Sequence, residues 1–418
     1  MNQNIVLQTF FSRFLVLLLN FGLVIYTVNL WGSDGKGAIS MVIADLTIIS
    51  FFTNIFVGST VSYYASKFKT EQILPVAYLW SLLSGVLIAT AFSFVHPSEY
   101  SVHLLILSVI AALLTTNINL FIGKKNVHLF NLYSVAQYLI HFVFILIIVY
   151  AVRVNSVSVY FTAQILCLGI LYLISTVQIM RHCNFTLISV SKSIVRQLFQ
   201  YGWKTQLSAF LQFLNYRLSF YFLESFKGIV SVGIFSVGVV FAEAIWMVSR
   251  SLSVILYSDL VNNSNPDYAI AKTKAAIRVS FFVTLLFLLI MLIIPAQFYA
   301  VIFGEDFIQT KQIVVLLSPG ILAIAVSNII GYYFAGINKL KILNVKSIIG
   351  LLITIVASYY IVPRWGIIGA CVVTTISYCI SSAILFWRFY QLTDFNMKDF
   401  LFSKSEIALI VNRIIKKT

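Results

Sequence analysis

Apolar residues fill most of the chain in long runs that are separated by short polar segments. About twelve of these runs approach the roughly 20 residues that an α-helix needs to cross a bilayer core. The twelve runs are Phe10–Trp31, Ala38–Tyr63, Ile73–Val95, Val102–Ile122, Leu129–Val152, Val157–Met180, Tyr201–Leu223, Val230–Tyr257, Ser280–Ile302, Gln312–Ala335, Ile342–Val362 and Gly366–Trp387. This pattern predicts an all-α polytopic membrane protein with about twelve transmembrane helices.

Two of the polar segments, Arg181–Gln200 and Ser258–Val279, are longer than the others. The first segment mixes apolar and basic residues, as amphipathic helices at a membrane surface do, and it separates six runs from six. The sequence therefore predicts an N-terminal six-helix lobe (1–182), a cytoplasmic amphipathic linker (183–200), a C-terminal six-helix lobe (201–391) and a cytoplasmic amphipathic tail (392–418).

The two halves also share a short pattern. The second run opens with GAIS (Gly37–Ser40) and the eighth contains GIFS (Gly233–Ser236), and each pattern is followed by an acid, Asp45 or Glu243. Because the matches occupy equivalent places, they favour a duplicated transporter with two pseudo-symmetric six-helix lobes.

Composition supports the membrane assignment, since hydrophobic residues make up 60% of the chain and charged residues only 10%. A soluble domain of this length needs more charge at its surface. If the N-terminus is cytoplasmic and the loops alternate, most basic residues fall on the cytoplasmic side. Those left outside are Lys36, Arg153, Lys227, Lys311 and Arg364. This asymmetry predicts that both termini are cytoplasmic. The net charge of +15 is then explained by topology and by attraction to anionic lipid, and no nucleic-acid partner is expected.

Four cysteines lie within or beside apolar runs, namely Cys167, Cys183, Cys371 and Cys379. Such positions favour buried free thiols over a disulfide framework. No zinc-ligand spacing occurs in the sequence, so no metal site is expected.

Five charged residues fall well inside the apolar runs: Arg13, Arg217, Arg250, Asp45 and Glu243. A charge at the centre of a membrane helix costs at least ~2.5 kcal/mol on insertion scales, so each of these residues is a functional-site candidate. Other roles are open. Arg13 could extend its charge to the inner surface, and Arg217 and Arg250 could form purely structural ion pairs.

Helical spacing groups these charges with other polar residues. In the first run, Thr9, Arg13, Asn20 and Thr27 recur at intervals of four and seven and share one face. In the seventh run, Gln206, Arg217 and Glu224 share a face. A second face of that run, predicted to contact a neighbouring helix, consists of Ser208, Gln212, Asn215 and Ser219.

Glu243 and Arg250 lie two turns apart on one face of the eighth run, a separation of roughly 10.5 Å. They cannot bond directly in a straight helix. Glu243 therefore either couples an ion to transport or balances Arg250 at a distance. Asp45 lies on a different face from the other polar residues of its run.

Polar faces on several runs are most simply explained by a shared water-filled cavity with three arginines against two acids. The planar guanidinium of arginine matches phosphate. We therefore expect Arg13, Arg217 and Arg250 to bind the phosphate or diphosphate of a cargo with a bulky polar remainder. Asp45, Glu243, Asn20 and Gln206 are further cavity or coupling candidates, with H⁺ or Na⁺ as the possible coupling ion and no cofactor.

Several stretches resemble the Wzx-type oligosaccharide flippases of the MOP transporter superfamily. They are SRF (Ser12–Phe14), LWGSDGKGAIS (Leu30–Ser40), YGWKTQLSAFLQFLNYRLSFYFL (Tyr201–Leu223), VGIFSVGVVFAEAIWMVSRSLSVIL (Val232–Leu256) and the segment Leu316–Ile380. The resemblance implies two lobes that open alternately to either side of a bacterial inner membrane. It also implies that the cargo is an undecaprenyl-diphosphate-linked oligosaccharide for O-antigen of lipopolysaccharide, or for another surface polysaccharide. Arg13 and Arg250 occupy places comparable to cavity-facing arginines of related lipid flippases.

The resemblance further implies partners among the polymerase and chain-length proteins of polysaccharide synthesis, and it implies transport without enzymatic chemistry. Two other functions are weighed against this one. A drug or organic-cation antiporter of the same superfamily should have a net acidic cavity. A membrane polysaccharide polymerase should have a large external loop, and the sequence predicts only short ones.

Overall fold

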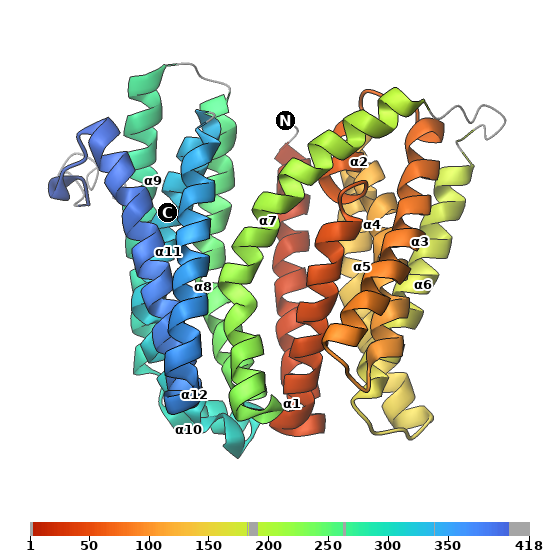
Figure 1. Ribbon diagram of the computed structural model, residues 1–418, viewed down its shortest axis with the longest axis horizontal. Helices are drawn as coiled ribbons and strands as arrows, with labels where there is room; N and C mark the ends of the chain where they lie inside the picture. Colours follow the sequence, from red (N-terminus) through yellow and green to blue (C-terminus); the bar gives the residue numbers. More distant parts are fainter. Residues whose placement is uncertain (1–2, 182, 184–190, 262–264, 338, 401–418) are drawn as a thin grey trace. The chain divides into compact units, whose positions relative to one another are not determined.

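The computed structural model describes residues 3–181, 183, 191–261, 265–337 and 339–400 (Figure 1). All regular elements in these residues are helical, which confirms the predicted all-α class. The chain divides into two compact units, Met1–Phe210 and Leu211–Thr418. Nine helices in the described part are long and apolar enough to cross a membrane, and two of these are more than 50 residues long.

In its described residues, unit 1 contains six α-helices and the first part of a seventh. In chain order, the elements are α1 (Gln3–Thr53), α2 (Gly58–Tyr64), α3 (Thr70–Val95), α4 (Ser101–Gly123), α5 (Val127–Leu146) with the π-turn η1 (Ile147–Ala151), α6 (Ser158–Met180) and α7 (Lys192–Lys227). The segment predicted as an amphipathic linker is described only in part. Residues 192–200 are the beginning of α7, so the helix continues without a break into the seventh apolar run.

Unit 2 holds the rest of α7 and the remaining elements. These are α8 (Ile229–Val261), α9 (Pro266–Ile293), α10 (Ala296–Phe303), η3 (Glu305–Gln309), α11 (Thr310–Gly336), α12 (Leu340–Thr393) and η4 (Met397–Phe400). The seventh predicted run, within α7, is not among the nine apolar helices because polar and charged residues interrupt it.

Two pairs of predicted runs are joined by a single residue. The backbone of α1 turns at Gly32 (φ 64°, ψ −162°), and that of α12 turns at Gly366 (φ 55°, ψ −128°). Positive φ values of this kind favour glycine, which has no Cβ to clash with the backbone. α12 thus contains two of the predicted spans, whereas α1 contains the first span and most of the second, whose end from Gly58 belongs to α2. Figure 1 shows α1 turning back on itself in unit 1.

The fourth span of each half is its central helix. In unit 1, α4 packs against α3, α5 and α6; in unit 2, α11 packs against α8, α9 and α12. Close approach of α8 to α11 depends on Gly238, where a Cβ would lie 2.3 Å from a side-chain carbon of Ile313. Small residues at such contacts let helices pack closely in a bilayer. Each unit therefore surrounds one central helix with its own neighbours.

The predicted loop Ser258–Val279 is wrong, because most of it is helical. α8 extends to Val261, and α9 begins at Pro266 rather than at Ser280. The Asn265 side chain caps α9 by accepting from the backbone N–H groups of Asp267 (2.9 Å) and Tyr268 (3.3 Å). Charged residues lower the hydropathy of this segment, so it did not count as an apolar run. The backbone is nevertheless helical from Pro266, because Asn265 caps it.

The other end of α9 is held by a lysine from α11. The Nζ of Lys311 donates to the carbonyl oxygens of Met291, Leu292 and Ile294. These carbonyls lack partners within the helix, and they carry the negative end of its dipole. Lys311 therefore ties the end of α9 to the start of α11.

The described part of the C-terminal tail packs onto unit 2. Phe395 is buried and contacts Phe386 and Phe389 of α12. The Asp399 carboxylate lies 2.8 Å from Nζ of Lys274, and its backbone carbonyl accepts from Nε of Arg278 at 2.9 Å. The remainder of the predicted tail, residues 401–418, lies outside the described residues.

All four cysteines are free thiols, as predicted. Cys167 and Cys371 are buried, whereas Cys183 and Cys379 are partly exposed.

Candidate functional site

An ion pair joins α7 to α8 in unit 2. Nη2 of Arg217 lies 2.7 Å from Oε1 of Glu243, and the two side chains are 25% and 32% exposed. The guanidinium also lies over Phe220, with Cζ 5.0 Å from the ring centroid. Glu243 thus has a direct counterion on a neighbouring helix, whereas the sequence left it either coupling an ion or balancing Arg250 at a distance.

Arg250 is exposed on α8, two turns beyond Glu243. It has no carboxylate within ion-pair distance among the residues that the structure describes. Because Glu243 already neutralises Arg217, the charge of Arg250 is available to an anionic ligand.

Three aromatic rings form a cluster beside this ion pair. Tyr216 and Trp246 lie 5.1 Å apart between ring centroids, and Tyr378 of α12 lies 5.5 Å from Tyr216 and 6.0 Å from Trp246. The Tyr216 hydroxyl accepts from Nε2 of Gln212 at 2.8 Å. Tyr216 and Trp246 are sequence neighbours of the charged residues, but no sequence signal links them to Tyr378.

The second polar face of α7 contacts a neighbouring helix only in part: Asn215 and Ser219 do so, as predicted, whereas Ser208 and Gln212 are exposed. Oδ1 of Asn215 accepts from Ser377 (2.9 Å) and Thr354 (3.3 Å), both on α12, and Ser219 bonds Thr374 at 3.1 Å. All of these side chains are buried. Their hydrogen bonds fix α7 against α12, so this part of the face is packing surface within unit 2.

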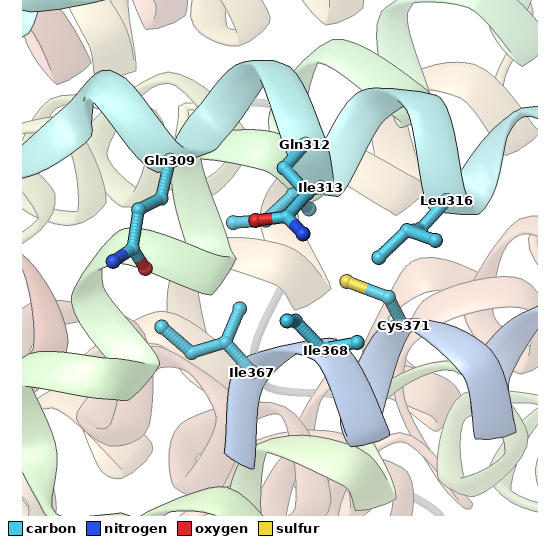
Figure 2. Close-up of a pocket in the computed structure, with 7 residues that line it drawn as sticks. All are labelled: Gln309, Gln312, Ile313, Leu316, Ile367, Ile368 and Cys371. Atoms are coloured by element: carbon cyan, nitrogen blue, oxygen red, sulfur yellow. The ribbon is translucent and has the colours of Figure 1, made fainter. Parts of the chain in front are cut away.

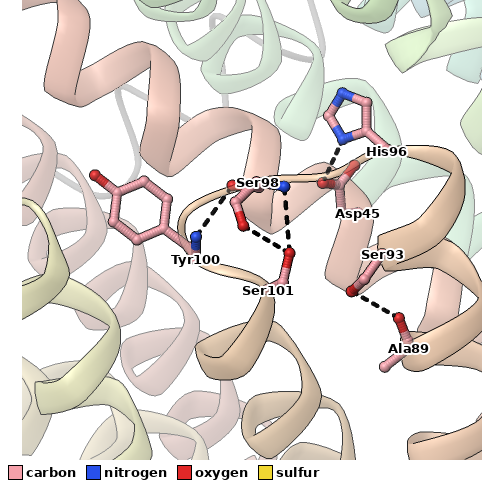
Figure 3. A network of polar contacts seen from close by, with 7 residues as sticks. All are labelled: Asp45, Ala89, Ser93, His96, Ser98, Tyr100 and Ser101. Atoms are coloured by element: carbon pink, nitrogen blue, oxygen red, sulfur yellow. Dashed lines mark hydrogen bonds and ion pairs between the residues drawn. The ribbon is translucent and has the colours of Figure 1, made fainter.

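A second acid–base pair lies in unit 1. Oδ2 of Asp45 lies 3.2 Å from Nδ1 of His96, and Figure 3 shows the imidazole directed at the carboxylate. Asp45 is only 1% exposed, whereas His96 is 26% exposed. The turn after His96 is held by Ser101, whose Oγ donates to the carbonyl of Ser98 (2.7 Å) and accepts from its N–H (3.2 Å). This pair combines a buried acid with a titratable partner that has access to its surroundings.

Arg13 of α1 has a different environment from Arg217. Its side chain is exposed, and Cζ lies 5.4 Å from the ring centroid of Phe130 on α5. One turn earlier, the Thr9 hydroxyl accepts from Nδ2 of Asn131 at 3.0 Å, which fixes this end of α1 against α5. Arg13 has no carboxylate partner in the described part of the chain.

The rest of the predicted polar stripe divides into two environments. Asn20 is exposed, but Thr27 is buried and donates to the carbonyl of Leu23 in its own helix at 2.8 Å. Gln206 of α7 is partly exposed. Asn20 and Gln206 are therefore accessible in their own units, whereas Thr27 is satisfied within the helix.

One buried lysine was not predicted from the sequence, which places it among the basic residues at the cytoplasmic side of the helices. Lys346 lies on α12 and is 8% exposed, and its Nζ donates to Oγ of Ser327 on α11 at 3.0 Å. Its position near the start of a long apolar helix gave no indication of burial.

One small cavity lies between α11 and α12 (Figure 2). Its volume is about 70 Å³, and its walls include the side chains of Gln312, Leu316, Ile368 and Cys371. This volume admits a few water molecules at most and excludes a lipid head group. No predicted site residue lines this cavity. Among the described residues, no three His, Cys, Asp or Glu side chains gather as metal ligands.

No protein-family model matches the sequence, and no curated protein matches it. Solved structures do resemble it. The lipid II flippase MurJ, in its inward closed conformation, aligns with 96% of this chain and 89% of its own at 16% identity and a TM-score of 0.71. A MOP superfamily transporter from Pyrococcus furiosus, described as having a binding pocket of reverse polarity, aligns over 93% and 94% at 15% identity with a TM-score of 0.64.

A point mutant of the Vibrio cholerae MATE transporter VcmN aligns over 96% of this chain and 99% of its own at 12% identity, with a TM-score of 0.65. Near-complete coverage of both chains means that these proteins share the same overall fold. The chain is therefore a polytopic membrane protein with the MOP fold. At these identities the comparison describes the fold alone, so function has to be argued from the residues.

Proposed function

We propose that the protein is a flippase that moves undecaprenyl-diphosphate-linked oligosaccharides across the bacterial inner membrane. Three observations support the proposal: the MOP fold, the likeness to a lipid II flippase, and intramembrane arginines that exceed their acidic partners. The resemblance to Wzx-type flippases, read from the sequence, adds the oligosaccharide and the pathway of O-antigen or another surface polysaccharide. Polymerase and chain-length proteins would be its partners.

The observation that carries this proposal is the state of Arg13 and Arg250. Both are exposed within their own units, and neither has a carboxylate partner among the described residues. An unpaired guanidinium is costly in a membrane protein unless a ligand or water satisfies it. A diphosphate offers several oxygens in the geometry that arginine binds best.

In this mechanism Arg13 and Arg250 hold the diphosphate while the lobes open alternately to the two sides. Arg217 would share its charge between Glu243 and the cargo, and the Tyr216–Trp246–Tyr378 cluster would offer ring faces to sugars. Asn20 and Gln206 would contact the cargo's hydroxyl groups. Both termini would be cytoplasmic, as the distribution of basic residues favours.

Coupling to H⁺ or Na⁺ would act through the two acids. Asp45 has the buried environment and the imidazole partner that proton binding requires, and Glu243 has an arginine that competes with any cation. We therefore propose Asp45 as the stronger coupling candidate.

An organic-cation antiporter is the main alternative, because MATE transporters share the fold. A cationic drug would be repelled by unpaired arginines, and it would be bound by an unpaired acid. In the described residues, the two acids of the predicted site each have a basic partner. A polysaccharide polymerase is the second alternative, which the fold likeness to transporters disfavours.

The test is transport by purified protein in liposomes. Wild-type protein should move a fluorescent undecaprenyl-diphosphate oligosaccharide between leaflets, and Arg250→Ala should slow that movement about tenfold, since a charge-assisted hydrogen bond contributes about 1.5–3 kcal/mol. Proton- or sodium-driven uptake of organic cations, with no movement of the lipid-linked oligosaccharide, would establish the antiporter instead. Size-exclusion monodispersity of each variant controls for folding.

A further inference from the structure

A groove of about 530 Å³ opens on unit 1 at the end of α4 and the beginning of α5. It is several times larger than the cavity in Figure 2. Its walls come from α2, α4, α5 and the turns beside them. The residues that line it are Ser59, Ser62, Tyr63, Ser66, Asn119, Ile122, Gly123, Lys125 and Phe130. None of these residues was predicted to belong to the functional site.

Both aromatic residues in its wall, Tyr63 and Phe130, make a cation–π contact. Nζ of Lys67 lies 4.0 Å from the ring centroid of Tyr63 and donates to the Tyr63 hydroxyl at 2.6 Å. Cζ of Arg13 lies 5.4 Å from the ring centroid of Phe130. Attraction to an aromatic ring fixes a cation without neutralising it.

A third cation, Lys125, lines the groove directly. Its backbone is left-handed (φ 63°), and its N–H donates to the carbonyl of Ile122 at 3.0 Å, so it forms a tight end to α4. The next residue, Asn126, caps α5 by accepting from the N–H of Leu129 at 3.2 Å. The chain around Lys125 is thereby held on both sides. Among the described residues, Arg13, Lys67 and Lys125 have no carboxylate partner.

Hydroxyl groups complete the wall. Ser59, Ser62 and Ser66 recur along α2 and the turn after it, and Ser62 donates to Oδ1 of Asn119 at 2.9 Å. The Asn119 amide in turn donates to the carbonyl of Thr115 at 2.9 Å. The Ser66 hydroxyl donates to the carbonyl of Tyr63 at 3.0 Å and can still accept a hydrogen bond, and the exposed Ser59 hydroxyl can donate to or accept from a hydroxylated ligand.

We infer that this groove is a docking subsite for the glycosyl-phosphate part of the lipid-linked cargo, separate from the contacts of Arg250. The inference rests on the proposed function and adds a place where the cargo first binds. Lys67 and Lys125 take the phosphate charge, and Ser59, Ser66 and the groove's aromatic edges contact the first sugar. Arg13 lies over the ring of Phe130, so it adds a further positive charge beside the groove.

A sugar-bearing diphosphate fits these walls better than an ordinary anionic phospholipid does. Both ligands supply phosphate for the lysines, but only the glycosyl phosphate supplies a ring of hydroxyl groups for the serines and Asn119. The volume is also sufficient for a phosphate together with one sugar ring. The basic ends of α2 and α4 belong to the side that the proposed topology places in the cytoplasm, where the cargo is made.

The test compares lipid binding by full-length protein in nanodiscs. The probes are undecaprenyl diphosphate carrying one sugar, undecaprenyl diphosphate alone, and phosphatidylglycerol as the competing source of phosphate. Replacing both lysines, with Lys67→Gln and Lys125→Gln, should weaken binding of the sugar-bearing lipid about tenfold or more, since charge-assisted hydrogen bonds are lost. Lys124→Gln is the matched control, because Lys124 is adjacent to Lys125 but does not line the groove. Lys67 does not line it either, but its Nζ contacts the ring of Tyr63, which does.

A second variant tests the sugar contact. Ser59→Ala with Ser66→Ala should weaken binding of the sugar-bearing lipid while leaving undecaprenyl diphosphate unchanged. Equal loss of phosphatidylglycerol and sugar-bearing lipid in the lysine variant would make the groove a general phospholipid site and overturn the inference. If both variants bind the lipids normally while Arg13→Ala still transports poorly, the groove is not a docking subsite, but the proposed transport function stands. Failure of wild-type protein to bind or move any lipid-linked sugar would instead overturn the proposed function.

Discussion

Arg13 in unit 1 and Arg217 in unit 2 are both arginines inside long apolar segments, but their surroundings differ. Arg217 has a carboxylate at 2.7 Å and an aromatic ring beneath it. Arg13 has only the ring of Phe130, at 5.4 Å. The charge of Arg217 is therefore neutralised within the protein, whereas Arg13 has no carboxylate partner among the described residues.

The acids of the two units also differ in the kind of partner that each has. Glu243 of unit 2 is paired with a permanent cation, since arginine does not lose its proton in proteins. Asp45 of unit 1 is paired with His96, which is charged only when protonated. Each unit contains an arginine with no carboxylate partner among the described residues, Arg13 in unit 1 and Arg250 in unit 2. The units differ in their acids, because unit 2 has a fixed ion pair and unit 1 has a titratable one, so we expect the proton chemistry to belong to unit 1.

The largest expected effect is at Arg13. Arg13→Ala should lower transport per folded molecule about 100-fold, because a bidentate phosphate contact contributes two charge-assisted hydrogen bonds of about 1.5–3 kcal/mol each. Protein yield and monodispersity should stay close to wild type, since no carboxylate in the described residues depends on Arg13. Transport assays in liposomes, normalised to folded protein, measure this effect. Normal transport by Arg13→Ala would show that the unpaired Arg13 contributes no more to transport than the paired Arg217 does.

Arg217→Ala should act mainly on stability. It leaves Glu243 without its counterion, at a cost of about 1–2 kcal/mol, which is reduced from that of a buried pair because both side chains are partly exposed. Thermal unfolding in detergent measures the loss. Exchanging the charges with Arg217→Glu and Glu243→Arg should recover most of it. If the exchanged protein is stable but cannot transport, Arg217 also contacts the cargo.

A comparable effect is expected at the acid of unit 1. His96→Ala removes the imidazole from a carboxylate that is 1% exposed, and should destabilise the protein by about 2 kcal/mol. His96→Gln keeps a hydrogen-bonding group and should restore stability. It should also remove any pH dependence of transport, because glutamine does not titrate. Pronounced pH dependence in His96→Gln would move the coupling site away from this pair.

The smallest effect concerns the tail of unit 2. Burial raises the pKa of Asp399, but the Asn396 N–H, Lys274 and Arg278 lower it by more, so the net pKa is below its ordinary value of 3.8. A depressed pKa means that the contact stabilises the fold above that value and is lost only as pH falls below it. Lys274→Gln should cost about 0.5 kcal/mol at neutral pH, as expected of partly exposed ion pairs. A pH titration of thermal unfolding should show the wild-type and variant curves converging only in strong acid.

The apolar runs predicted the helices well, but they did not predict where the helices end. Hydropathy marks the part of a helix that lipid covers, so it missed the polar start of α9 at Pro266 and of α7 at Lys192. Asn265-Pro266 was a recognisable start signal, since asparagine caps helices and proline fits their first turn. The single-residue turns at Gly32 and Gly366 could not be predicted from apolar length alone.

Charge positions were predictable from the sequence, but charge pairing was not. Spacing along α8 placed Glu243 and Arg250 on one face, yet the partner of Glu243 comes from α7, because contacts between helices depend on how each helix is rotated. His96 was missed since it lies just beyond α3, outside any apolar run. Lys67 and Lys125 were treated as ordinary surface residues; Lys125 lines the groove, and Lys67 contacts the ring of Tyr63, which also lines it.

The one-residue turn at Gly32 has a consequence for how the protein is made. With no loop between its two limbs, α1 (Gln3–Thr53) is expected to enter the bilayer as a single helical hairpin. The only charges beside that turn are Asp34 and Lys36, so little polar material crosses the membrane with it. Insertion of the second limb therefore helps to hold the first limb in the membrane. The apolar residues of both limbs together offset the cost of inserting Arg13.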